Sequence, residues 1–176
     1  MTGKEFLNSL ANGKSDILQE LLVILTETES RYCVIGGLAV NAYVEPVVSL
    51  DVDIVIAADN IESVTIAARK HEWKIERFEN SINIGSPGSD LRIQIQTDPR
   101  YQGFLANAES GNILGYTMKV AALEDLLQGK VWAWMDQTRR RSKRQKDLAD
   151  ILRLLEAFPK LEAKLPQSLK EQLLEE

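Results

Sequence analysis

The sequence predicts an α+β fold, in which a small mixed β-sheet carries helices on one face and a helical region follows it. Two observations support this class. Strand-like apolar runs alternate with helix-period segments through the first part of the chain, and from Leu123 onward the period is helical. At 176 residues and 44% hydrophobic, the chain can bury one sizeable core. We expect a core over residues 1–110 and a C-terminal helical region over residues 111–176 packed on it.

Local signals place the elements of the first half. Ser15 is expected to cap a helix whose apolar residues recur at helical spacing as far as Leu25. A Glu-Pro pair at 45–46 ends a short helix, because proline cannot continue one. The expected order is the helix after Ser15, strand 32–35, a short helix to about Val44, strand 50–57, and a helix from Asp59 to about His71.

The second half begins with strands and ends with helices. A turn-rich insert at 86–90 predicts an antiparallel hairpin between the two runs that flank it. The expected order is strand 73–78, hairpin strands 81–85 and 91–97, a helical turn over 101–108, a short connection over 112–119, helices 123–136 and 143–157, and an amphipathic tail after Pro166.

A glycine pair and an aspartate pair carry the chemical information. Gly36 and Gly37 stand between a buried strand and a helix, where bare backbone N–H groups favour an anion such as a phosphate. The alternative is a tight turn that binds nothing. Asp51 and Asp53 lie two residues apart in the next strand, so their carboxylates point to the same face. They are suited to a divalent cation such as Mg²⁺; the alternative is a solvent-facing strand edge.

These residues resemble the nucleotidyltransferase superfamily with the DNA polymerase β-like core, and in particular the small bacterial AbiEii-type toxins. The resemblance runs from Arg31 to about Leu155. It rests on Gly36-Gly37-Leu38-Ala39, on Asp51-Val52-Asp53, and on the helical segments that contain Lys130 and Arg144-Gln145-Lys146-Asp147-Leu148-Ala149-Asp150. It implies an NMP transfer from a nucleoside triphosphate to an acceptor hydroxyl.

The resemblance also implies roles for single residues. Asp51 and Asp53 would hold Mg²⁺, and the glycine pair and Lys130 would hold the phosphates. Lys130 could equally be a snorkelling lysine. Arg144 and Asp147 belong to the segment that contacts substrate or orients the helical region, or they form a surface ion pair.

Two positions depart from the family pattern. The third carboxylate belongs on the 91–97 strand, where this chain has Gln94, a neutral and weaker ligand for a hard cation. Asp98 shares the face of Gln94 but lies roughly 13 Å along the strand. Where relatives often have Arg-x-Thr before the aspartates, this chain has Val47-Val48-Ser49, so Ser49 is expected to contact substrate without the arginine.

Two functions therefore stay open. One is an active Mg²⁺-dependent nucleotidyltransferase, the toxin-like member of a toxin–antitoxin pair, with an RNA or protein acceptor and a cognate antitoxin as partners. The other is a catalytically weakened domain that binds nucleotide or a partner protein in a regulatory role. The neutral side chain of Gln94 is the feature that supports the second.

The charge distribution and the cysteine content limit the kinds of partner and the cellular compartment that we expect. The formal net charge of −5 divides into −7 over residues 1–90 and +2 over residues 91–176, with a basic stripe from Arg139 to Lys146. This stripe is suited to an RNA backbone or is simply a solvated helix start. The single cysteine, Cys33, lies in an apolar strand and fits a reducing compartment. With no apolar run near the ~20 residues of a membrane span, we expect a cytoplasmic protein without a membrane partner.

Overall fold

The computed structural model describes residues 1–12 and 15–174. Its elements are, in order, α1 (Gly3–Leu10), α2 (Ile17–Glu27), β1 (Tyr32–Ile35), α3 (Gly36–Val40), β2 (Asp51–Ile56), the 3-10 helix η1 (Ala58–Asn60), α4 (Ile61–Lys70), β3 (Lys74–Arg77), β4 (Ser81–Gly85), β5 (Arg92–Gln96), the 3-10 helix η2 (Pro99–Asn107), β6 (Glu109–Ile113), β7 (Tyr116–Val120), α5 (Leu123–Met135), α6 (Arg141–Ala157), the 3-10 helix η3 (Pro159–Lys164) and α7 (Gln167–Leu174).

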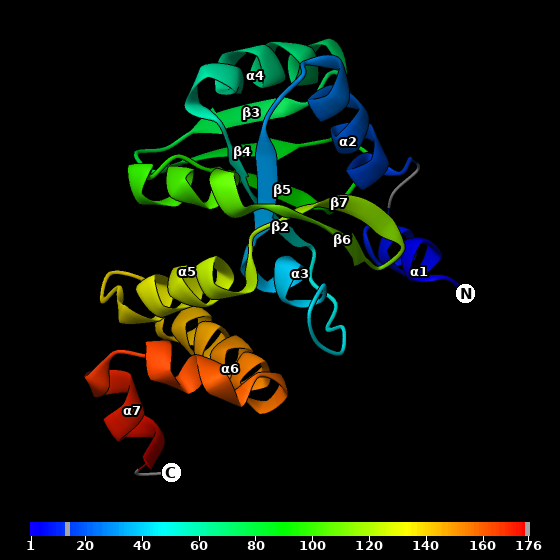
Figure 1. Cartoon of the computed structure of the whole chain (residues 1–176). Helices are drawn as coiled ribbons and strands as arrows, with labels where there is room; N and C mark the ends of the chain where they lie inside the picture. The colour runs from blue at the N-terminus through cyan, green and yellow to red at the C-terminus, as the bar shows by residue number, and fades with distance from the viewer. Residues whose placement is uncertain (13–14, 175–176) are drawn as a thin grey trace.

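The strands form one mixed sheet in the order β3-β4-β5-β2-β1-β7-β6. β2 pairs with β5 in parallel and with β1 antiparallel, and β7 pairs with β1 in parallel. Figure 1 shows this sheet between the pair α2 and α4 and the group α5, α6 and α7. The mixed sheet followed by C-terminal helices confirms the predicted fold class.

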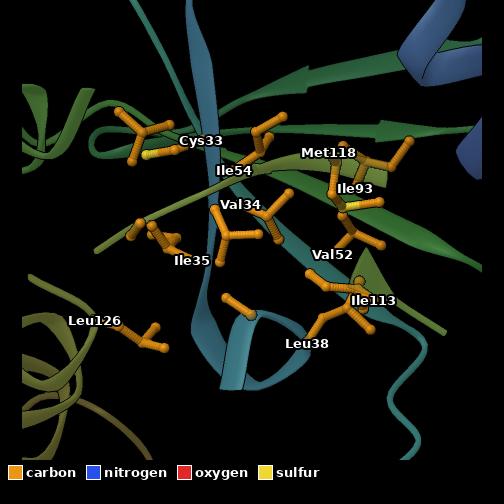
Figure 2. Packing of buried hydrophobic residues seen from close by; sticks show 14 of the residues in the cluster. Cys33, Val34, Ile35, Leu38, Val52, Ile54, Ile93, Ile113, Met118 and Leu126 are labelled. Atoms are coloured by element: carbon orange, nitrogen blue, oxygen red, sulfur yellow. The ribbon is translucent and has the colours of Figure 1, made fainter. Parts of the chain in front are cut away.

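The apolar positions of the strands build the core. Val52 and Ile54 of β2 are fully buried, as are Ile93 and Ile95 of β5 beside them, because side chains alternate across a strand. Figure 2 shows that β1, β2, β5, β6, β7, α3 and α5 all contribute side chains to this cluster. One face of β2 is therefore buried, and the opposite face presents Asp51 and Asp53.

Several local predictions need correction. The cap of α2 is Asp16, whose carboxylate accepts from the Gln19 amide at 3.0 Å, so Ser15 is not the cap. The cap residue of α4 is Asn60, because Asp59 lies in the preceding turn of η1. Residues 109–120 form the hairpin β6–β7 of the sheet, where the sequence predicts only a short connection. The division of the chain at residue 110 stays a prediction.

The first helix, α1, was not predicted from the sequence. α1 begins with a capping box, in which the Thr2 hydroxyl accepts from the Glu5 amide and the Glu5 carboxylate accepts from the Thr2 amide. Thr-x-x-Glu is a known start signal for a helix and could have identified α1.

Candidate active site

Asp51 and Asp53 lie at the start of β2, and their side chains point to the face of the sheet opposite the core. Asp51 and Asp53 are both half-buried, and Val52 between them is fully buried on the other face. Both carboxylates line the same groove. The arrangement meets the requirement that two ligands of one cation must point to one side of the sheet.

Gly36 is required where β1 turns into α3. Its φ is +71°, a conformation that L side chains rarely adopt. A Cβ at this position would also overlap the Asp53 carboxylate. Because Ile35 lies opposite Asp53 in the β1–β2 ladder, the turn and the carboxylate are held together by the sheet. The motif thus brings bare backbone into contact with the second aspartate.

The negative charge of Asp53 has fewer compensating partners than that of Asp51. Its side chain forms no hydrogen bond or ion pair with any residue that the structure describes. Burial raises the pKa of Asp53; the positive charge of Lys130 opposes this rise and the negative charge of Asp51 adds to it. The fold therefore keeps a carboxylate with an unfavourable burial beside the glycine turn.

Asp51 is neutralised within the fold. One carboxylate oxygen lies 2.8 Å from Nε of Arg92, and the other lies 3.1 Å from Nζ of Lys143. Arg92 is opposite Asp51 on β5, and Lys143 comes from the first turn of α6. Both side chains are partly exposed, so these contacts are exchangeable rather than rigid.

Gln94 stands where the third carboxylate of the family is expected. It lies directly opposite Asp53 in the parallel β2–β5 ladder, and its exposed side chain lines the same groove. The role of Gln94 as the third position of the site stays a prediction. Its neutral amide offers an oxygen ligand but cannot take a proton at neutral pH.

The donor set fits a magnesium ion with two carboxylates. Among residues 1–12 and 15–174, no group of three or more His, Cys, Asp and Glu side chains is placed to hold a metal. Magnesium is usually held by one or two carboxylates together with substrate phosphates. The uncompensated carboxylate of Asp53, next to Asp51 on one face, meets that requirement.

Lys130 is buried in an ion-pair network between α5 and α6. Its Nζ lies 3.1 Å from Asp147 and 2.6 Å from Asp150, with the lysine side chain 7% exposed. Arg139 also pairs with Asp147 at 2.8 Å, and Arg153 pairs with Asp150 at 2.8 Å. The snorkelling alternative for Lys130 is therefore wrong, since its charged end is buried and paired with two aspartates. Asp147 is likewise buried rather than part of a surface pair.

The other predicted contacts lie away from the cavities. A Cβ on Gly37 would be 3.4 Å from Asp150, so this glycine packs against the network. The Ser49 hydroxyl accepts from the Asp51 amide at 3.1 Å, which fixes the start of β2. Arg144 donates to the Trp134 carbonyl at 2.7 Å and to Gln137 at 3.2 Å, which joins α5 to α6. Their roles in substrate binding stay predictions.

Two cavities meet at Asp53 and Gln94. A cavity of about 120 Å³ lies on the side of Gly36 and Lys130 and is also lined by Tyr101 and Phe104. A larger groove of about 480 Å³ extends from Asp51 across the open faces of β5, β4 and β3. Both share Asp53, Gln94 and Arg139. A reaction centre at Asp53 would therefore be reached from two sides.

Sequence reasoning missed the aromatic side of the smaller cavity. Tyr101 and Phe104 pack edge to face with ring centroids 5.2 Å apart, and Trp132 stacks on Phe104 at 5.7 Å. The available signal was the run Tyr101-x-x-Phe104, which lies within the predicted helical turn over 101–108. Cys33, by contrast, is no candidate nucleophile, because burial raises the pKa of its thiol to about 12.

Solved structures share this fold. The lincosamide antibiotic adenylyltransferase LnuA, bound to lincomycin, matches at 12% identity over 81% of this chain and 98% of that chain, with a TM-score of 0.57. ANT(2")-Ia in complex with adenylyl-2"-tobramycin matches at 13% identity over 84% and 91%, with a TM-score of 0.61. An antigenic nucleotidyltransferase-like protein from Paracoccidioides brasiliensis matches at 19% identity over 85% and 75%, with a TM-score of 0.52.

The sequence comparisons are more specific. A search of curated protein sequences finds no match. No helix in the described part of the chain has the length and apolarity that a bilayer crossing needs. The profile described as "Nucleotidyl transferase AbiEii toxin, Type IV TA system" matches residues 20–175, which is most of the chain. The chain therefore belongs to the AbiEii nucleotidyl transferase family.

Proposed function

We propose that this protein transfers the NMP moiety of a nucleoside triphosphate to an acceptor hydroxyl, with Mg²⁺ held by Asp51 and Asp53. The observation that carries the proposal is the contact between the Asp53 carboxylate and the Gly36 turn. It places a metal-type ligand beside the backbone N–H groups of a strand-to-helix turn, which favour an anion. The family membership supports nucleotidyl transfer as the reaction class.

The chain's own residues account for substrate placement. The triphosphate lies along the turn at Gly36, with the buried positive charge of Lys130 at the wall of the smaller cavity. When bound, Mg²⁺ neutralises charge on the triphosphate and polarises the reacting phosphorus centre. Arg139 lines both cavities and adds positive charge where the pyrophosphate departs. Asp147 and Asp150 hold Lys130 in place.

We propose a toxin role in a toxin–antitoxin pair, with an RNA or protein acceptor and a cognate antitoxin as partners. The match to a family described as a Type IV toxin–antitoxin component supports this proposal. The test is growth after induced expression: wild type should arrest growth, and the double substitution Asp51→Ala with Asp53→Ala should not.

A second function is favoured by one observation. Gln94 replaces the third carboxylate, so the chain would bind nucleotide and regulate a partner without efficient transfer. Radiolabelled NTPs with Mg²⁺ and a cell extract separate the two functions. Transfer predicts a labelled acceptor with wild type and none with the Asp51→Ala, Asp53→Ala variant. Binding alone predicts a higher melting temperature with NTP, no labelled product, and labelling only after Gln94→Asp.

A further inference from the structure

Side chains of the chain itself hold both carboxylate oxygens of Asp51. Oδ1 lies 2.8 Å from Nε of Arg92, and Oδ2 accepts a hydrogen bond from Nζ of Lys143 at 3.1 Å. Magnesium binds to a carboxylate through these same oxygens. Arg92 and Lys143 therefore contact the atoms that the proposed metal site requires.

The two basic side chains reach Asp51 from different elements. Arg92 lies opposite Asp51 in the parallel β2–β5 ladder. Lys143 comes from the first turn of α6, in which no residue is acidic. A positive charge near a helix N-terminus is unfavourable because of the helix dipole. Asp51 is the carboxylate that pairs with Lys143, so it offsets this unfavourable position.

The pairing differs between the two aspartates. Asp53 forms no ion pair with any residue that the structure describes, whereas Asp51 is paired twice. Both line the larger groove, together with five basic residues and one other acidic residue. A divalent cation that approaches Asp51 would therefore be repelled by neighbouring side chains and would have to replace at least one of the two ion pairs.

Both basic side chains are free enough to leave the carboxylate. The side chain of Arg92 is 72% exposed and that of Lys143 is 35% exposed, while that of Asp51 is 30% exposed. Ion pairs at such exposure contribute little to stability, because water and salt compensate the separated charges. The two contacts can therefore be exchanged for a divalent cation while β5 and α6 stay folded.

We propose that Arg92 and Lys143 are competing counter-ions of the metal site: they hold Asp51 and release at least one of its oxygens when a divalent cation binds. The inference rests on the proposed function, which makes Asp51 a metal ligand. Its consequence is a low affinity for the free metal ion, which rises when either basic side chain is removed. Arg92 and Lys143 are positioning residues, because they act on the metal through Asp51.

The test measures the binding of free Mn²⁺, which takes the oxygen ligands of Mg²⁺ and is detected by electron paramagnetic resonance. No nucleotide is added, so the result is independent of transfer. Arg92→Gln and Lys143→Gln should each bind Mn²⁺ between about twofold and tenfold more tightly than wild type. The controls Arg69→Gln and Lys160→Gln change exposed residues that do not line the groove, and they should leave the affinity unchanged.

A double-mutant cycle shows whether the effect passes through Asp51. In an Asp51→Asn background, Lys143→Gln should lose most of its effect on Mn²⁺ affinity, because the side chain no longer holds a carboxylate. A spectroscopic readout follows the same exchange in wild type. Addition of Mg²⁺ should move the Nε–Hε resonance of Arg92 toward its position in the Asp51→Asn variant. Thermal melts confirm that each variant is folded.

The outcomes separate this inference from the proposed function. Tighter Mn²⁺ binding by both glutamine variants, lost in the Asp51→Asn background, supports it. Affinity equal to or below that of wild type in either variant overturns it, even if NTP binding depends on Mg²⁺. Failure of the labelling experiment above, with these binding results intact, would reject transfer and leave the competition in place. If neither wild type nor the variants bind Mn²⁺, the inference and the proposed metal site are both rejected.

Discussion

At the scale of single residues, Asp53 carries a carboxylate whose burial is unfavourable. It is half-buried beside Gly36, and no described residue pairs with its carboxylate. Burial raises its pKa, so in the folded state it binds a proton at a higher pH than it does in the unfolded state. Stability from this group therefore falls as pH rises from the ordinary aspartate range through the raised folded pKa. At neutral pH the ionised carboxylate is a cost to folding.

Asp53→Asn should therefore raise the melting temperature at pH 7 while it removes Mg²⁺-dependent function. The gain should shrink at acidic pH, where wild-type Asp53 is already protonated. Melting curves from pH 4 to 8 check this, with the exposed Asp59→Asn as control. A lower melting temperature for Asp53→Asn at pH 7 would show that the carboxylate stabilises the fold, against this account.

The aspartates and the glycine turn could be predicted from sequence because their spacing is local. A period of two fixes a shared face for Asp51 and Asp53 in any strand, and Gly36 marks a turn with positive φ. The neighbours Arg92 and Asn83 could not be predicted. Their positions depend on the order β4-β5-β2, which no local pattern specifies.

At the scale of elements, the packing of α5 on α6 depends on Lys130. Its ammonium group lies between Asp147 and Asp150, which approach it from successive turns of α6. Removal of one partner from such a buried network leaves charge uncompensated, although Arg139 and Arg153 still pair with the two aspartates.

Lys130→Met keeps the length of the side chain and removes the charge. We expect the free energy of unfolding to fall by about 3 kcal/mol, measured by urea denaturation. Lys160→Met on the surface should stay within about 0.5 kcal/mol of wild type. If Lys130→Met lost NTP affinity with unchanged stability, its role would be phosphate binding alone and the structural role would be rejected.

The prediction of secondary-structure elements failed where pairing between strands distant in sequence determines the structure. The helices after Leu123 follow from their period, and α5 and α6 lie within two residues of their expected bounds. The hairpin β6–β7 was missed because Glu109–Ile113 is mostly polar and mostly exposed, without the alternation of a half-buried strand. Its pairing with β7, and the parallel pairing of β7 with β1, hold it in the sheet.

At the scale of the whole molecule, one core joins the sheet to the helices that follow it. Leu126 and Val131 of α5, and Ile151 and Leu154 of α6, belong to the same buried cluster as the strands. Arg153 of α6 also donates to the Glu45 carbonyl in the loop after α3. Helices α5 and α6 thus share a buried core with the sheet.

We expect the chain to unfold in one cooperative transition. Tryptophan fluorescence reports on α5 through Trp132 and Trp134 and on the core beside β3 through Trp73, and circular dichroism at 222 nm reports on all helices. The two midpoints in urea should coincide. Two separate transitions would show that the C-terminal helices form an independent unit.

The central claim is that a divalent cation between Asp51 and Asp53 holds the triphosphate against the glycine turn. Isothermal titration with each of the four NTPs, in Mg²⁺ and again in EDTA, tests it directly. Wild type should bind at least one NTP more tightly in Mg²⁺, and Asp51→Asn with Asp53→Asn should bind equally weakly in both. A Mg²⁺ dependence that survives in the double variant would contradict the account.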